Sequence, residues 1–494
     1  MCSTPNEPRR LLLPSPPLVA LLWLAGGMLG CTPESNAGIA WDETDVGGPT
    51  NTSGDEDDGS GDTGPSDDGS DDSGAPDDPP PGESPPEVPA RYPGHSVHSP
   101  ITPFVAARMR EIAQLDPDHA DDVFMKAGAS STVSHDTLHC FVDDPIELGD
   151  HVDLRPTLEY FEDGDAAGST PFDRDTEAAQ AGQPIGWAIE GDPSPIDIEA
   201  ELLSPRLALL HFGANDMGWG ATRGDALVNF HGTMMQMVDG LIDRGIVPIL
   251  FGVTRRGDNP SAQVWVGTWN ATLRAIAQSR QVPFVDLYEA IDPLPGHGLS
   301  EDGLHLEAYS GGACVLDDSG LQHGYNVRNL VALEVLDRAA AVLVDEQPGL
   351  DPPHVAMSGE GTPDEPWVIA QLPFTDVRNT ATDGARFVDE YPGCNDDSDE
   401  SGPELWYRLE LDRTTRLRAA VLDMDGVDID VQLVDDSATG EGCLARGHHF
   451  VETTLDPGTY HFALDTWVSD GTPLAGEFHF VLVECDDDDE SCDT

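Results

Sequence analysis

Residues 206–216 read RLALLHFGAND, an apolar run that ends in Gly213, Ala214, Asn215 and Asp216. A short apolar run that is closed by turn residues predicts a buried strand. Segments with the helical spacing of apolar residues separate this run from three similar ones, which are VFMKAG (123–128), GIVPILFGV (245–253) and VPFVDL (282–287). Strands that alternate with helices predict an α/β domain with a parallel sheet, which we place at residues 92–347.

Polar residues follow the ends of these predicted strands. The first run leads into GASST (128–132) with Ser130, the run at 206–213 leads into Asn215, and the loop SEDGLH (300–305) carries Asp302 and His305. Ligand chemistry in open α/β sheets gathers at the carboxyl ends of the strands. These side chains are therefore the candidate site.

The residue types fit nucleophilic catalysis. A serine hydroxyl needs an adjacent base, and histidine titrates near neutrality, so His305 is predicted to be the base for Ser130. A carboxylate on the other ring nitrogen fixes the tautomer, which is the role predicted for Asp302. The alternatives are a helix cap at Ser130 and Ser131, a turn at Asn215, and a solvated loop pair at Asp302 and His305.

We expect neither a metal nor a cofactor, because no cluster of histidines and carboxylates has the spacing of a zinc or di-metal site. Four further histidines are interpreted as non-catalytic: His135, His139, His211 and His297.

Three blocks in order, Gly128-Ala129-Ser130, Gly213 to Asp216 and Asp302 to His305, resemble the SGNH or GDSL-type hydrolase family. The resemblance covers about half of the chain. It implies a flavodoxin-like three-layer fold and hydrolysis of carboxylic esters through a serine nucleophile. The family usually has Asp where this sequence has Ala129, and Ser131 stands beside Ser130, so the nucleophile is assigned by its spacing from Gly128.

The resemblance also implies an oxyanion hole. Its donors would be the backbone N–H of Ser130, the side-chain amide of Asn215 and the backbone N–H of a glycine. In EAAQAGQPIGWAIEG (177–191) the AAxxG run favours Gly182 for this position, and Gly186 is the alternative.

From residue 352 to 486 strict alternation replaces helical spacing, and DG and PG turns separate the runs, which predicts a β-sandwich. The string LDPGTYHFALD (455–465) resembles the pre-peptidase C-terminal accessory domain of secreted bacterial proteins. MDGVDID (424–430) is either a calcium loop or a strand with alternating exposed Asp, and residues 487–494 form an acidic tail.

The N-terminus predicts export. Arg9 and Arg10 precede an apolar stretch that ends in MLGC (28–31), which resembles a bacterial lipobox. Residues 1–30 are therefore a predicted signal peptide and Cys31 the lipidation site, with an uncleaved membrane anchor as the alternative. By resemblance to bacterial lipoproteins, Thr32 favours the outer membrane or cell surface.

Residues 31–91 are rich in Asp, Gly, Ser and Pro, and such a composition predicts a disordered tether. The formal net charge of −68 excludes a nucleic-acid partner, because an acidic surface repels phosphates. Without Cys2 and Cys31, an even set of cysteines remains, and the simplest pairing is Cys140–Cys314, Cys394–Cys443 and Cys485–Cys492.

The sequence thus predicts a surface-anchored esterase that resembles secreted SGNH-like lipoproteins of myxobacteria. Its ester substrate stays open among acylated carbohydrate, lipid and peptidoglycan. The alternative is a binding lipoprotein that keeps the scaffold without turnover and recognises cell-surface or matrix carbohydrate. We expect a fragment of about residues 91–347 to fold alone and to keep any esterase activity, because all the catalytic elements lie within it.

Overall fold

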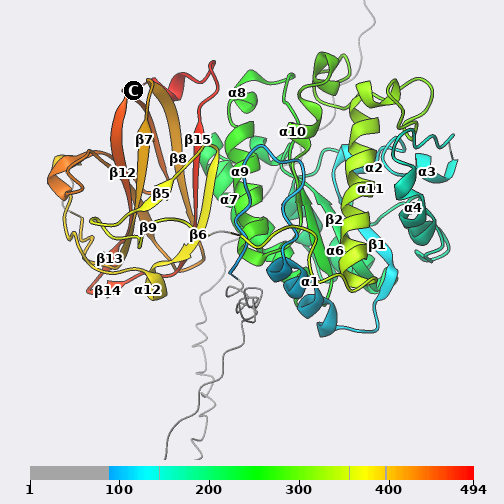
Figure 1. Ribbon diagram of the computed structural model, residues 1–494, viewed down its shortest axis with the longest axis horizontal. Coiled ribbons are helices and arrows are strands. Elements are labelled where there is room, and N and C mark those ends of the chain that lie inside the picture. Colours follow the sequence, from blue (N-terminus) through cyan, green and yellow to red (C-terminus); the bar gives the residue numbers. More distant parts are fainter. Residues whose placement is uncertain (1–87, 144, 355, 395–397, 494) are drawn as a thin grey trace, which may run out of the picture. The chain divides into compact units, whose positions relative to one another are not determined.

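The computed structural model describes residues 88–493 except 144, 355 and 395–397 (Figure 1). The predicted signal peptide, Cys31 and the predicted tether up to residue 87 lie outside the described residues. Within the described part of the chain, no helix combines the length and the apolar character that crossing a membrane requires.

Four strands form the parallel sheet of the α/β domain, in the order β1-β2-β3-β4. Each strand lies at one of the four apolar runs of the sequence, and the predicted α/β fold is confirmed. The strands read as continuous apolar runs because helices cover both faces of a parallel sheet. Their bounds are β1 (Ala120–Gly128), β2 (Pro205–His211), β3 (Val247–Phe251) and β4 (Phe284–Val285).

A single parallel bridge continues the sheet beyond β1. Gly128 donates its N–H to the carbonyl of Ala178, and Gln180 donates its N–H to the carbonyl of Gly128, both at 3.2 Å. This bridge occupies the place of an edge strand that follows β1 in sequence. With it the spatial order becomes the 2-1-3-4-5 order of flavodoxin-like folds. The same bridge brings the segment with Gly182 beside the end of β1.

Helices form a layer on each side of the sheet (Figure 1). In one layer α11 (Gly324–Leu343) contacts α1 (Pro103–Leu115), α4 (Arg155–Glu162) and α10 (Leu287–Ile291). The other layer contains α5 (Ile185–Ile189), α6 (Pro195–Leu203), α7 (Arg223–Ile242) and α9 (Val266–Arg280). The short helices are α2 (Ser130–Val133), α3 (Cys140–Asp143) and α8 (Pro260–Gln263).

Helix α7 illustrates why these segments are helical. It begins with a capping box, in which the Thr222 hydroxyl accepts from the Asp225 N–H and the Asp225 carboxylate accepts from the Thr222 N–H, both at 3.0 Å. Its apolar residues recur every three or four positions, and this stripe is buried: Leu227, Phe230, Met234, Val238 and Leu241.

The C-terminal part is the predicted β-sandwich. One sheet has the order β10-β9-β12-β7-β5, the other has the order β11-β8-β15-β6, and apolar side chains of both fill the space between them. The bounds are β5 (Trp367–Ile369), β6 (Phe374–Asn379), β7 (Glu404–Leu411), β8 (Thr415–Asp423), β9 (Ile429–Val434), β10 (Cys443–Gly447), β11 (Phe450–Leu455), β12 (Gly458–Thr466) and β15 (Glu477–Glu484). The remaining elements are the hairpin β13 (Val468–Ser469) with β14 (Thr472–Pro473), and α12 (Thr380–Asp383).

Helix α9 is buried nearly all round, because it also packs on the sandwich. Its Ala271 and Ala275 lie in one apolar cluster with Ala420 of β8 and with Val481 and Val483 of β15. Small side chains on α9 let the sheet approach closely, and a residue with a larger side chain has no room there.

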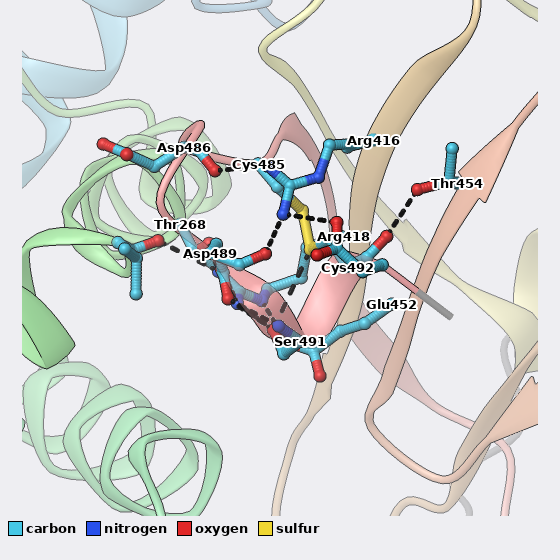
Figure 2. Close-up of a disulfide and its surroundings, with 12 residues drawn as sticks. Thr268, Arg416, Arg418, Glu452, Thr454, Cys485, Asp486, Asp489, Ser491 and Cys492 are labelled. Atoms are coloured by element: carbon cyan, nitrogen blue, oxygen red, sulfur yellow. Dashed lines mark hydrogen bonds and ion pairs between the residues drawn. A yellow bond between two sulfur atoms is a disulfide. The ribbon is translucent and has the colours of Figure 1, made fainter.

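Arg418 of β8 joins the C-terminal loop to α9, as Figure 2 shows. Its guanidinium, fully buried, donates to the Thr268 hydroxyl of α9 at 3.1 Å and to Glu452 at 2.7 Å, and it also pairs with Asp489. The Cys485–Cys492 disulfide closes the loop that carries Asp489. The segment predicted as an acidic tail is therefore packed onto the sandwich.

All three predicted disulfides are present, namely Cys140–Cys314, Cys394–Cys443 and Cys485–Cys492. The packed structure begins inside the range predicted for the tether. Ala90 is buried, and its N–H donates to the side-chain carbonyl of Gln281 at 2.7 Å.

Candidate active site

The loop SEDGLH is built around the carboxylate of Asp302. Its Oδ1 accepts from the Ser300 hydroxyl at 2.8 Å and from the N–H groups of Leu304 and His305, each at 2.9 Å. Gly303 has a φ of +70°, which a residue with a side chain rarely adopts. The loop thereby holds Asp302 and leaves its Oδ2 facing the His305 ring.

His305 links the carboxylate to the serine. Its Nδ1 lies 2.7 Å from Asp302 Oδ2, and its Nε2 lies 2.9 Å from Ser130 Oγ. The hydrogen bond from His305, with those from the loop backbone and Ser300, holds the pKa of Asp302 well below its usual range. A charged Asp302 accepts a hydrogen bond from His305 and so keeps the ring proton on Nδ1, which leaves Nε2 to accept from the Ser130 hydroxyl.

Ser130 begins α2, directly after β1. A Cβ on Gly128 would lie 2.1 Å from Thr132 Oγ1 and 2.8 Å from the carbonyl oxygen of His211, so only glycine fits at this turn. Of the two adjacent serines, it is Ser130 whose hydroxyl bonds to His305, whereas the backbone carbonyl of Ser131 accepts from the hydroxyl of Thr137 at 2.5 Å.

Arg328 supports this turn from behind, and sequence reasoning missed it. From α11 its guanidinium donates to the carbonyl of Ser131 at 3.1 Å, to Nδ1 of His211 at 3.3 Å and to the Thr137 hydroxyl. Burial lowers the pKa of Arg328 to about 10. Its only sequence signal is a cation within the apolar stripe of α11.

Asp216, also missed, connects the GAND turn to the segment with Gly182. Its Oδ2 accepts from the N–H of Gly213 at 3.0 Å and its Oδ1 accepts from the N–H of Ile185 at 2.8 Å. Burial raises the pKa of Asp216 to about 6. The GAND motif (213–216) contains this residue, but its spacing in the sequence does not show what the carboxylate binds.

Asn215 and Gly182 lie near one another across this connection. Asn215 donates its side-chain N–H to the carbonyl of Gln183 at 3.1 Å. Gly182 has a φ of +78° and lies in the loop between the bridge to β1 and α5, whereas Gly186 lies inside α5. The place of Gly182 beside the β1 end favours it over Gly186 for the oxyanion position, which stays a prediction.

A small pocket of about 30 Å³ brings the predicted groups together. Ser130, Ser131, Asn215 and His305 line it, and the remaining lining residues are Ala129, His211, Phe212, Gly213, Ala214, Val253, Thr254 and Leu304. The substitution at Ala129 therefore places a methyl group at the site where the family usually has a carboxylate.

Two of the histidines interpreted as non-catalytic have other partners. His297 bonds through Nδ1 to the carbonyl of Asp292 at 2.9 Å, and His211, which lines the pocket, bonds through Nδ1 to Arg328. In MDGVDID the alternating Asp were expected to be exposed, but Asp430 is 2% exposed and pairs with Arg446 and, at 3.1 Å, with His448. An arginine partner of this kind keeps a buried carboxylate charged, which explains the difference.

The sequence model of the GDSL-like lipase/acylhydrolase family matches residues 169–309, a range that contains Asn215, Asp302 and His305 but not Ser130. No curated protein sequence matches the chain.

Three solved structures are similar to parts of the chain. A GDSL-like lipase from Bacteroides thetaiotaomicron is 17% identical, over 48% of this chain and 99% of its own, with a TM-score of 0.30. A putative acylhydrolase from Bacteroides fragilis is 21% identical, over 47% and 94%, with a TM-score of 0.29. The pre-peptidase C-terminal domain of a Bacillus anthracis collagenase is 15% identical, over 22% and 89%, with a TM-score of 0.16.

These structural similarities carry no further argument. The match of residues 169–309 to the GDSL-like lipase/acylhydrolase family supports a hydrolase of ester substrates.

Proposed function

We propose that the protein is a serine hydrolase of carboxylic esters, with Ser130 as nucleophile, His305 as general base and Asp302 as its orienting carboxylate. One observation carries the proposal: the two nitrogens of His305 bond Asp302 and Ser130 at 2.7 and 2.9 Å. A nucleophile and a base within hydrogen-bond reach, with a third group orienting the base, are the geometric signature of this chemistry.

The steps follow from the bonds. Nε2 of His305 takes the hydroxyl proton while Ser130 Oγ attacks the acyl carbon, and the proton then passes to the departing alkoxide. Water, activated by the same nitrogen, cleaves the acyl-serine. The negative oxygen of each tetrahedral intermediate is held by the Ser130 N–H, the Asn215 amide and the Gly182 N–H.

A fluorophosphonate probe tests the nucleophile, and ester turnover tests the triad. The probe should label the full-length protein at Ser130, and Ser130→Ala and His305→Ala should each lower kcat by several orders of magnitude. The double variant should be little worse than either single one, because members of a triad act as a unit. Asn215→Ala should cost roughly a hundred- to a thousandfold, the effect of one lost oxyanion donor.

Unchanged turnover in His305→Ala, or labelling at Ser131 alone, would refute the assignment. If the protein neither reacts with the probe nor turns over any ester, the binding lipoprotein that recognises carbohydrate becomes the better interpretation. Ala129 is the one feature of the site that favours that outcome.

We infer that the acyl group is short. A cavity of about 30 Å³ compares with the roughly 10–15 Å³ that one water needs by the same measure, so it suits an acetyl group better than a long chain. Turnover of p-nitrophenyl acetate should exceed that of the octanoate at least tenfold in kcat/KM. A preference for the octanoate would contradict this inference. Residues outside this pocket would contact the alcohol part of the ester, which belongs to a carbohydrate or a lipid.

We also propose that lipid on Cys31 anchors the exported protein at the outer membrane or cell surface. The Arg-led apolar segment that ends in MLGC supports this proposal. In cell fractionation Cys31→Ser should move the protein from the membrane to the soluble fraction. A variant that remains as membrane-bound as the wild type would point to an uncleaved anchor instead.

A further inference from the structure

A cluster of two imidazoles and a carboxylate lies beside the nucleophile turn. Nε2 of His135 is 3.8 Å and Nε2 of His139 is 4.0 Å from the same oxygen, Oδ1 of Asp175. One ligand atom from each of the three residues lies within 4.8 Å of the other two. The cluster shares no residue with the triad, and none of its members has a part in the proposed ester hydrolysis.

Hydrogen bonding does not account for this arrangement. The distances to Asp175 exceed a hydrogen bond, and the two histidine rings lie face to face, with centroids 4.4 Å apart and planes inclined by 11°. Two ring nitrogens thus converge on one carboxylate oxygen without bonding to it.

The separations suit three ligands of one ion. Bonds of about 2.0–2.1 Å at a tetrahedral angle hold two ligand atoms roughly 3.3 Å apart. The side chains of His135 and Asp175 are 74% and 86% exposed, so small rotations close the remaining gap, while His139, 6% exposed, is fixed by packing.

Charges of both signs surround the cluster. Asp173 and Asp175 both act on His139, and Lys126 is the opposing cation. Lys126 lies behind the cluster, where its buried ammonium donates to the carbonyl of Phe172 at 2.7 Å.

We propose that His135, His139 and Asp175 bind one Zn²⁺ ion, with water completing its coordination. Imidazole nitrogens with one carboxylate suit zinc and its neighbours, whereas calcium and magnesium require oxygen ligands.

The ion would connect two segments that the active site depends on. His135 and His139 follow the helix that begins at Ser130, and Asp175 precedes the bridge at Ala179 and the loop with Gly182. A bound ion would hold the nucleophile turn against the glycine loop. Its function is structural, because none of its three ligands belongs to the triad.

Zinc titrated alone into the full-length protein, followed by calorimetry, tests the proposal. His135→Ala and Asp175→Asn change exposed side chains, so both variants should fold. Each should weaken zinc binding by at least about a hundredfold, since loss of a group that merely supports a ligand already costs up to that much. The control is His448→Ala, which removes a histidine from the cluster with Asp428 and Asp430 and should leave the affinity unchanged.

Thermal unfolding gives a second measurement. Zinc should raise the melting temperature of the wild type and of His448→Ala, but not of His135→Ala, because an ion that binds only the folded state stabilises it. Equal zinc affinity in the wild type, His135→Ala and Asp175→Asn would overturn the proposal. So would loss of binding in His448→Ala alone, which would place the ion in the sandwich.

Discussion

Asp302 shows how a single carboxylate serves both the loop and the site. One oxygen accepts three hydrogen bonds from residues 300, 304 and 305, and the other receives the His305 ring. The same atoms that fold the loop thus set the tautomer of the base.

Asp302→Asn should therefore lower kcat by roughly 10³–10⁴, because an amide in place of the carboxylate favours the wrong tautomer of His305. Steady-state kinetics with a short acyl ester measures the effect. Glu301→Gln is the matched control, since it neutralises the neighbouring exposed carboxylate and should leave kcat unchanged. Equal kcat values for the two variants would contradict the role of Asp302.

Asp216 gives a prediction of pH dependence. Burial raises its pKa to about 6 from the ordinary 3.8, so the folded state binds the proton more tightly than the unfolded state does. Stability from this group is present at low pH and is lost as the pH rises from about 4 to about 6. The shift corresponds to on the order of 3 kcal/mol.

Urea unfolding at pH 4.5 and pH 7 can measure this effect. The side chain of Asp216→Asn does not titrate. The free energy of unfolding of the wild type minus that of this variant should therefore be smaller at pH 7 than at pH 4.5. If this difference stays constant or increases with pH, burial does not raise the pKa of Asp216.

At the scale of elements, α11 positions the nucleophile helix through Arg328. The guanidinium of Arg328 donates to the carbonyl of Ser131 and to Nδ1 of His211 at the same time, which the ammonium of a lysine cannot reproduce. Arg328→Lys should therefore displace α2 and lower kcat by about tenfold to a hundredfold, with a smaller change in KM.

Arg338→Lys on the same helix is the control for this prediction. Arg338 bonds Asp351 and the carbonyl of Ser99, away from the serine, so its replacement should leave kcat unchanged. If both variants lose the same stability and neither loses kcat, Arg328 has only a structural role.

For the whole molecule, the shared helix α9 couples the α/β domain to the sandwich. Ala275 lies against Ala420, Val481 and Val483, and a long charged side chain there meets a packed apolar surface. Ala275→Arg should lower the free energy of unfolding by at least about 2 kcal/mol, through overpacking and burial of a charge. Gln236→Arg on the exposed face of α7 should change it little, as chemical denaturation can show.

The same contacts alter the expectation for a fragment that lacks the sandwich. Residues 88–347 retain every candidate catalytic group, but they expose the face of α9 that the sandwich covers. We expect the fragment to keep esterase activity and to melt at a lower temperature than the full chain. A fragment that melts at the same temperature would show that the interface adds no stability.

Much of this architecture was predictable from local pattern. The spacing of apolar residues predicts helices and strands that are buried on one or both faces. This spacing predicted the four strands of the parallel sheet, the stripe on α7 and the strands after residue 352. The three disulfides followed from the even number of cysteines and their division between two folded parts. The bridge at Ala179 was not predictable, because one paired residue has no periodicity.

The sequence alone determined which residues are available for chemistry: a serine after the first strand, an asparagine after the second, and an aspartate and histidine in one short loop whose turn needs Gly303. Only the tertiary structure decided which of them meet. It brought Ser130 rather than Ser131 to the ring of His305, placed Arg328 and Asp216 beside the predicted site, and gathered His135, His139 and Asp175. Contacts between residues far apart in the chain depend on how strands and helices pack, and no spacing within the sequence records that.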